Sequence, residues 1–220
     1  MKIKHLKIQT SNLEAQLEFY EKALGLPILE KNGTGFSVKI GYSILEFHQT
    51  EKSKPYHVAF HIGANQEKEA VHWLQNRVSI LQNEGKDIVD FPAWNAKSIY
   101  FYDEDQNVIE FISRKQLHQL DVDFSEKYIL GIAEIGLSTD TVEEFFRFLN
   151  VNFKLEIYFG KPDIFCAIGD ENGLLITVDK DEKTWFPTDD KALPADFDLK
   201  FERNGKLFEL NYEHGKLSVM

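Results

Sequence analysis

Short stretches in which apolar and polar residues alternate recur along the chain and predict β-strands. In the segment 56–63, Val58, Phe60 and Ile62 form a wholly apolar face, whereas His57 lies on the opposite face. An ordinary half-buried strand would turn its polar face to water. We expect this face to look into a cavity instead, because three other strands repeat the pattern.

The first strands and helix form a unit with the order β-α-β-β-β. A strand is expected at Ile3–Gln9, and the helix that follows starts with capping-box spacing at Ser11 and ends before Gly25. Three short strands should complete the unit, at Pro27–Glu30, Phe36–Ile40 and Ser43–His48.

The same order of elements then starts again. A strand over 56–63 places His57 where His5 stood, and a helix is predicted from Asn65 to about Leu81. Three strands should follow, at Ile88–Phe91, Ser98–Tyr102 and Val108–Ile112. Both units close on an apolar strand that contains one glutamate, Glu46 in the first and Glu110 in the second, which indicates an internal duplication.

A third unit follows a polar linker over 114–127. Its first strand is expected at Ala133–Leu137 and its helix starts at Asp140, again with capping-box spacing. Three strands complete it, at Lys154–Phe159, Asp163–Ile168 and Leu174–Val178. After a loop over 179–195, a hairpin around Asn204-Gly205 suggests a fourth unit that has lost its first strand and helix.

Composition and charge narrow the class of protein. The 220 residues carry a net charge of −11, which argues against a nucleic-acid partner. Cys166 is the single cysteine, so an intrachain disulfide is excluded and an intracellular site fits. The first ten residues lack the apolar core of a signal peptide, and no apolar run approaches the roughly 20 residues of a membrane span. We therefore expect a cytoplasmic protein with no membrane partner.

Several segments resemble the vicinal oxygen chelate superfamily, which includes glyoxalase I, bleomycin- and fosfomycin-resistance proteins, methylmalonyl-CoA epimerase and extradiol dioxygenases. The resemblance rests on His5–Ile8, Leu13–Ala15, Phe19–Leu26 and Tyr100–Phe111, with Gln106 where glycine is usual. It is good over 2–113 and weaker to about 213. It implies an α+β fold in which modules 1–52 and 53–113 form one curled eight-stranded metal-binding sheet. A linker over 114–127 and a degenerate second glyoxalase-like domain over 128–220 would follow.

The resemblance places metal ligands at His5, His57 and Glu110, and a fourth at Glu46 in glyoxalase-type members only. Two imidazoles and a carboxylate suit a divalent ion with open positions for substrate, and the residues alone support the same set. Iron, manganese, nickel and zinc remain open. Any one of these residues could instead be an ordinary surface side chain; burial inside the curled sheet would require pairing or a metal.

Other polar residues share the same predicted interior. His61, His48 and Tyr100 are candidates for proton transfer, and Lys7, Gln9 and Tyr102 for substrate contacts, the alternative for each being a solvent-exposed rim position. In the third unit Glu134 occupies the first-histidine position, and Glu209 occupies the last-glutamate position. We expect this half to be structural, covering the first half or forming a homodimer, with Trp185 and Phe186 lining substrate if its loop covers the cavity.

Two classes of function follow. The leading one is a metal-dependent enzyme that chelates neighbouring oxygens of a small-molecule substrate, in the manner of a ring-cleaving dioxygenase or of a glyoxalase- or epimerase-type lyase or isomerase. The other is a non-catalytic drug-binding protein of the bleomycin-resistance type, with a metal-free cavity lined by aromatic residues.

Overall fold

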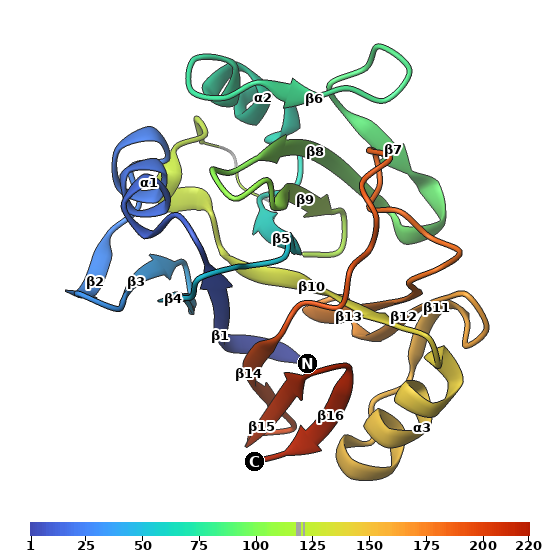
Figure 1. The fold of residues 1–220 in the computed structure, drawn as a ribbon. Coiled ribbons are helices and arrows are strands. Elements are labelled where there is room, and N and C mark those ends of the chain that lie inside the picture. Colours follow the sequence, from blue (N-terminus) through green and yellow to red (C-terminus); the bar gives the residue numbers. More distant parts are fainter. Residues whose placement is uncertain (118–119, 121) are drawn as a thin grey trace.

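The computed structural model describes residues 1–117, 120 and 122–220, and this part of the chain forms two sheets (Figure 1). Sheet A runs, from edge to edge, through β16 (Lys216–Val219), β15 (Lys206–Glu213), β14 (Phe197–Arg203), β1 (Lys2–Thr10), β4 (Ser43–Gln49), β3 (Gly35–Ile40) and β2 (Ile28–Asn32). Sheet B runs through β11 (Ile157–Lys161), β12 (Phe165–Asp170), β13 (Gly173–Asp179), β10 (Gly131–Thr139), β5 (His57–Ile62), β9 (Val108–Arg114), β8 (Ala96–Tyr102) and β6 (Ile80–Leu81), and β7 (Val89–Phe91) also pairs with β8.

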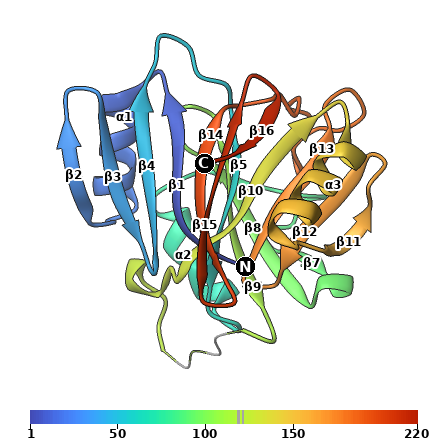
Figure 2. The same cartoon turned by 90° about the horizontal axis from the view of Figure 1, so that it is seen from below.

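The three predicted β-α-β-β-β units are present, which confirms an α+β fold. Their helices are α1 (Leu13–Glu18), α2 (Glu67–Gln75) and α3 (Val142–Phe153). Figure 2 shows α1 behind the strands of the first unit and α3 beside β12 and β13 of the third. A π-helical turn (Phe19–Ala23) extends α1, and 3-10 turns occur at Pro92–Trp94 and Glu126–Tyr128. None of the helices in the described chain is both long and apolar enough to cross a lipid bilayer.

The apolar strand faces pack as predicted. Leu6, Phe47, Val58 and Phe111 are each fully buried and belong to one hydrophobic cluster that both sheets share. Because successive side chains of a strand point to opposite faces, this packing leaves the polar side chains of the same strands on the other face of each sheet.

The first two units do not share one sheet, contrary to the expected pairing. β1 lies antiparallel to β14 in sheet A, whereas β5 lies antiparallel to β10 in sheet B. The first unit therefore forms its sheet with the C-terminal strands, and the second unit forms its sheet with the third unit. The alternating pattern specifies which face of a strand is buried, but it carries no information on which partner its open edge finds.

The C-terminal hairpin forms around Asn204-Gly205, both with positive φ (52° and 73°), as a two-residue turn between twisted strands requires. β14 occupies the place beside β1 that β5 holds beside β10. The position of a first strand in the fourth unit is thus filled, and the expectation that this strand was missing is corrected.

Three local predictions also need correction. Neither capping box forms, because Asn12 and Thr141 are the N-caps and neither side chain makes a cap hydrogen bond. The predicted second helix, 65–81, is shorter, since α2 ends at Gln75 and Ile80–Leu81 pair with β8 instead. Arg114 belongs to β9 rather than to a linker. Residues 118, 119 and 121 of the predicted linker lie outside the described residues.

A buried aspartate organises the turn between β8 and β9. Asp103 accepts the backbone N–H groups of Asp105 and Asn107 at 3.1 and 3.0 Å, and the Tyr20 hydroxyl donates to it at 3.1 Å. Burial raises the pKa of Asp103 to about 6, although hydrogen bonds from Asn107 and Gln16 act to lower it. At neutral pH the fold therefore holds a buried carboxylate that would ionise more readily in the unfolded chain.

The substitution Asp103→Asn tests this turn. The pKa of Asp103 in the folded protein lies above the ordinary 3.8. Between pH 4 and 6 the folded wild type therefore keeps a proton on Asp103, whereas the unfolded chain has lost it. Stability relative to the variant should therefore rise by up to roughly 3 kcal/mol as the pH falls from 6 to 4, and stay constant above pH 6. Urea unfolding of both proteins across this range measures the difference; parallel curves would contradict the assignment.

Candidate metal centre

The register of sheet B brings three ionisable side chains to one point. Ala59 on β5 pairs with Glu110 of β9 on one side and with Glu134 of β10 on the other. His57 lies two residues before Ala59 and so points to the same face. A β-bulge at Ala133 sets Glu134 opposite Ala59. The small methyl group of Ala59 leaves room for the two carboxylates to face each other.

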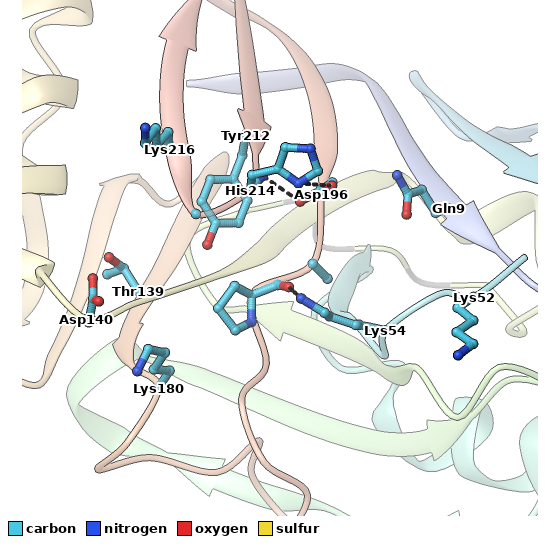
Figure 3. Close-up of a pocket in the computed structure, with 13 residues that line it drawn as sticks. Gln9, Lys52, Lys54, Thr139, Asp140, Lys180, Asp196, Tyr212, His214 and Lys216 are labelled. Atoms are coloured by element: carbon cyan, nitrogen blue, oxygen red, sulfur yellow. Dashed lines mark hydrogen bonds and ion pairs between the residues drawn. The ribbon is translucent and has the colours of Figure 1, made fainter. Parts of the chain in front are cut away.

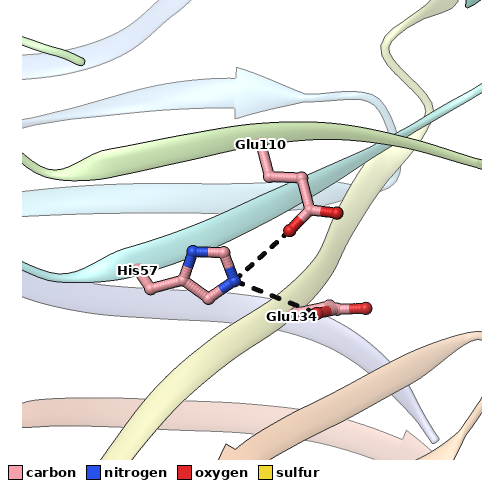
Figure 4. A group of neighbouring side chains, drawn as sticks. All are labelled: His57, Glu110 and Glu134. Carbon is pink, nitrogen blue, oxygen red and sulfur yellow. Dashed lines mark ion pairs between the residues drawn. The ribbon is translucent and has the colours of Figure 1, made fainter. Parts of the chain in front are cut away.

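One oxygen of each carboxylate lies near the imidazole (Figure 4), and the other is held by a neighbouring side chain. His57 Nε2 lies 3.3 Å from Glu110 Oε2 and 4.0 Å from Glu134 Oε2. The Ser98 hydroxyl donates to the other oxygen of Glu110 at 2.5 Å, and the Arg114 guanidinium donates to the other oxygen of Glu134. The ligand atoms of His57, Glu110 and Glu134 all lie within 4.8 Å of one another.

The cluster contains two buried carboxylates, whose negative charge requires positive charge nearby. Glu110 and Glu134 are each 3% exposed. Burial raises the pKa of Glu134, and repulsion from Glu110 adds to it, while Arg114 and His57 act in the opposite direction. Burial acts to lower the pKa of His57, but the Glu110 and Glu134 carboxylates outweigh it and raise that pKa overall. One imidazole and two anchored carboxylates form a donor set that fits a divalent metal ion.

The cluster opens into a cavity of about 210 Å³ between sheet B and the loop after β13. Six of its wall residues are aromatic: Phe91, Trp94, Tyr100, Phe165, Trp185 and Phe186. The Trp185 ring stacks on the His57 imidazole with a centroid distance of 5.5 Å and an interplanar angle of 27°. Trp185 and Phe186 thus lie in the wall of a site cavity, as expected, but it is the cavity of sheet B.

The remaining predicted ligands lie in sheet A. His5 pairs with Lys200 of β14, which in turn pairs with Glu209 of β15, in the same arrangement as Glu134, Ala59 and Glu110. Lys200 stands where sheet B has Ala59, and its ammonium lies 3.0 Å from Glu209. His5 Nε2 lies 3.0 Å from Glu46. The structure therefore brings His5 together with Glu46, and His57 together with Glu110, in different sheets.

The predicted catalytic and substrate residues are similarly divided. Tyr100 lines the sheet B cavity, and burial, with the nearby Glu110 carboxylate, raises its pKa well above 10. His61 Nε2 lies 3.2 Å from the Asn172 carbonyl, outside this cavity. The Tyr102 hydroxyl donates to Asp190 at 2.5 Å. His48 is exposed on β4, and Lys7 Nζ lies 3.7 Å from Glu46, both in sheet A.

Gln9 lines a second, larger cavity of about 740 Å³ that also borders four lysines, Lys52, Lys54, Lys180 and Lys216 (Figure 3). The Lys54 ammonium donates to the Pro194 carbonyl at 2.7 Å. Among the described residues, the one group with metal-binding geometry is the cluster in sheet B, so we take that cluster as the candidate centre.

Sequence reasoning missed Glu134 as a candidate ligand, together with Ser98 and Arg114 as the outer partners of the two carboxylates. The signal for Glu134 was present, because its position in the third unit matches that of His5 in the first. The sequence predicts a structural role for it, because Glu134 and Glu209 are the acidic positions of a C-terminal half that lacks a matching histidine. The structure supplies that histidine from the second unit.

Comparison with known proteins agrees with this architecture. The model of the Glyoxalase/Bleomycin resistance protein/Dioxygenase superfamily matches residues 2–111. The chain belongs to this superfamily. The superfamily match covers the first two units, so the assignment of the third unit to the site comes from the structure. The metallothiol transferase FosB of Staphylococcus haemolyticus is 33% identical over 117 residues, which span 49% of this chain and 80% of the relative. FosB of Staphylococcus epidermidis is 33% identical over the same shares.

Two solved structures share the fold over most of the chain. A candidate dioxygenase of Bacillus subtilis matches with a TM-score of 0.60 and 13% identity, over 81% of this chain and 63% of that protein. A glyoxalase I variant of Zea mays matches with a TM-score of 0.54 and 14% identity, over 80% of this chain and 66% of that protein. At these identities the likeness concerns the fold alone, and the chain spans about two thirds of each of these proteins.

Proposed function

We propose that this chain is a metal-dependent enzyme that binds a small substrate through neighbouring oxygens at His57, Glu110 and Glu134. The observation that carries the proposal is the convergence of these three side chains, each carboxylate having one oxygen fixed by an outer partner. Such outer partners orient ligands and are a usual part of metal centres. The metallothiol transferase relatives, whose name implies a metal, are consistent with it.

The donor set supports a fairly hard divalent ion. Two carboxylate oxygens and one imidazole nitrogen, with no thiolate, suit manganese or iron(II), while nickel and zinc stay open. Such an ion would polarise the coordinated oxygens of the substrate and, if redox-active, support reaction with O₂. Three ligands on one side would leave positions free on the side of the cavity.

The cavity favours a small, flat and largely apolar substrate. Its volume of about 210 Å³ lies below the range of roughly 300–1,000 Å³ that is usual for drug-sized ligands. Six aromatic side chains make up much of its lining. The Tyr100 hydroxyl is protonated at neutral pH, since its pKa is raised further above the ordinary value of 10, and it can donate a hydrogen bond beside Glu110. These features support an aromatic diol as the substrate and ring cleavage as the reaction. They support less well the lyase alternative, whose substrate would be the larger adduct of an aldehyde and a thiol.

Metal analysis followed by two assays tests this proposal. We expect the purified protein to retain close to one divalent ion per chain, and to consume O₂ with simple catechols in an oxygen electrode once loaded with iron(II) or manganese. A methylglyoxal–thiol assay on the same samples tests the lyase alternative. Turnover there, without O₂ uptake, would replace ring cleavage by lyase chemistry; failure to bind any of the four metals would refute the metal centre.

A second candidate function is a metal-free binding protein, and one observation favours it. Arg114 is buried against Glu134, and the pKa of His57 is raised, so two cations could balance the two carboxylates without an ion. The same aromatic cavity would then hold a ligand and not convert it. Titration calorimetry with a catechol tests this function on protein that EDTA has freed of metal. Binding at an affinity that added metal does not change would support a metal-free binding protein.

A further inference from the structure

The loop that closes the sheet B cavity is an ordered cap rather than a loose connection. We call residues 180–196, between β13 and β14, the lid. Its turn is closed by the Trp185 N–H, which donates to the Asp190 carbonyl at 2.8 Å. Side chains of sheet B fasten its middle: the Tyr102 hydroxyl donates to Asp190 at 2.5 Å, and the Ser138 hydroxyl donates to the Ala192 carbonyl at 2.5 Å.

Trp185 is the largest buried side chain of the lid. It is 4% exposed, and its six-membered ring packs over Gly136 so closely that a Cβ atom there would lie 2.5 Å from Trp185 Cη2. Its indole Nε1–H is buried and has no hydrogen-bond partner among the described residues. Buried indole N–H groups normally find an acceptor, and this unpaired donor belongs to a ring that lines the cavity.

A second donor comes from the same segment. Lys183, two residues before Trp185, also lines the cavity, and within the described chain its ammonium makes no ion pair. The lid thus contributes an indole ring and a lysine side chain to the lining of a cavity whose sheet side carries two carboxylates. The acceptors already in the cavity, Glu110 and Glu134, have donors of their own. Ser98 donates to Glu110, Arg114 donates to Glu134, and His57 lies beside Glu110.

We infer that Lys183 and Trp185 form a specificity site for an acidic oxygen group on the substrate, and that the substrate is a small aromatic carboxylic acid. The inference rests on the proposed function, because it requires the neighbouring oxygens at the other end of the molecule to be held at the metal centre. An ammonium and an N–H donor together favour a carboxylate over a neutral substituent of similar size. A cavity of about 210 Å³ has room for one ring with such a group.

Two probes of matched shape test this directly: 3,4-dihydroxybenzoate, which carries the carboxylate, and 4-methylcatechol, which replaces it by a methyl group. Binding to the metal-loaded protein is measured by titration calorimetry under nitrogen. The wild type should bind the carboxylate probe at least about tenfold more tightly, as a hydrogen bond to a charged group implies. Lys183→Met and Trp185→Phe should each lower this ratio to below about threefold, by weakening the carboxylate probe alone.

A matched control separates this inference from folding and from the proposed function. Lys191→Met removes a lid lysine that does not line the cavity and should not change the ratio. If the wild type prefers neither probe, or if both lid variants keep the preference, the specificity site is refuted while the metal centre stands. If neither probe binds to metal-loaded wild type, the proposed substrate class fails, and this inference fails with it.

Discussion

Replacing Glu134 by Gln should reduce the affinity for a divalent ion at least about a hundredfold, because losing even an outer partner of a ligand typically costs ten- to a hundredfold. The amide keeps the size of the side chain and can still accept from Arg114, but it lacks the anionic oxygen that faces His57. Titration of the metal-free protein with Mn²⁺ and Zn²⁺ measures the loss. His57→Ala and Glu110→Gln should have effects of similar size.

Sheet A provides the matched control for this experiment. His5 and Glu46 are of the same residue types as His57 and Glu110, and they occupy the equivalent strands of the first unit. We expect His5→Ala to leave the metal affinity within about twofold, since its side chain lies in the other sheet. Loss of binding in His5→Ala, together with retention in Glu134→Gln, would overturn the site in sheet B and support the set predicted from the sequence.

Arg114→Met should lower the free energy of unfolding of the metal-free protein by about 3–5 kcal/mol. Arg114 is 1% exposed, and its guanidinium is the ionic partner of the buried Glu134. Removing one member of a buried ion pair leaves the other charged and unpaired. Methionine fills a similar volume, so the effect reports charge more than packing. Urea unfolding in the presence of EDTA measures it.

Metal should restore part of this loss, because a bound ion would become the partner of Glu134. The stabilisation that saturating Mn²⁺ confers should therefore be larger in Arg114→Met than in the wild type. The double variant Arg114→Met/Glu134→Gln removes both charges and should recover stability in EDTA. A loss below about 1 kcal/mol in the single variant would mean that Arg114 is not required to balance Glu134.

The local patterns of the chain contained most of the fold. Alternation placed Val58 and Phe60 in the core and His57 on the opposite face, and Asn204-Gly205 specified the last turn. The recurrence of one unit also assigned Glu134 the position that His5 holds in the first copy. These features depend on a period of two residues and on turn geometry, which short segments carry without help from the rest of the chain.

The pairing of the strands depends on interactions between residues that lie far apart in the sequence. Every unit offers the edge of its first strand, and β5 meets β10 rather than β1. That pairing exchanges His5 for Glu134 at the centre beside His57 and Glu110, and it places a bulge at Ala133 and the small Ala59 where the carboxylates must fit. A pairing between residues about 75 positions apart depends on the complementarity of whole strand edges and on the packing of both units, so no local pattern could have specified it.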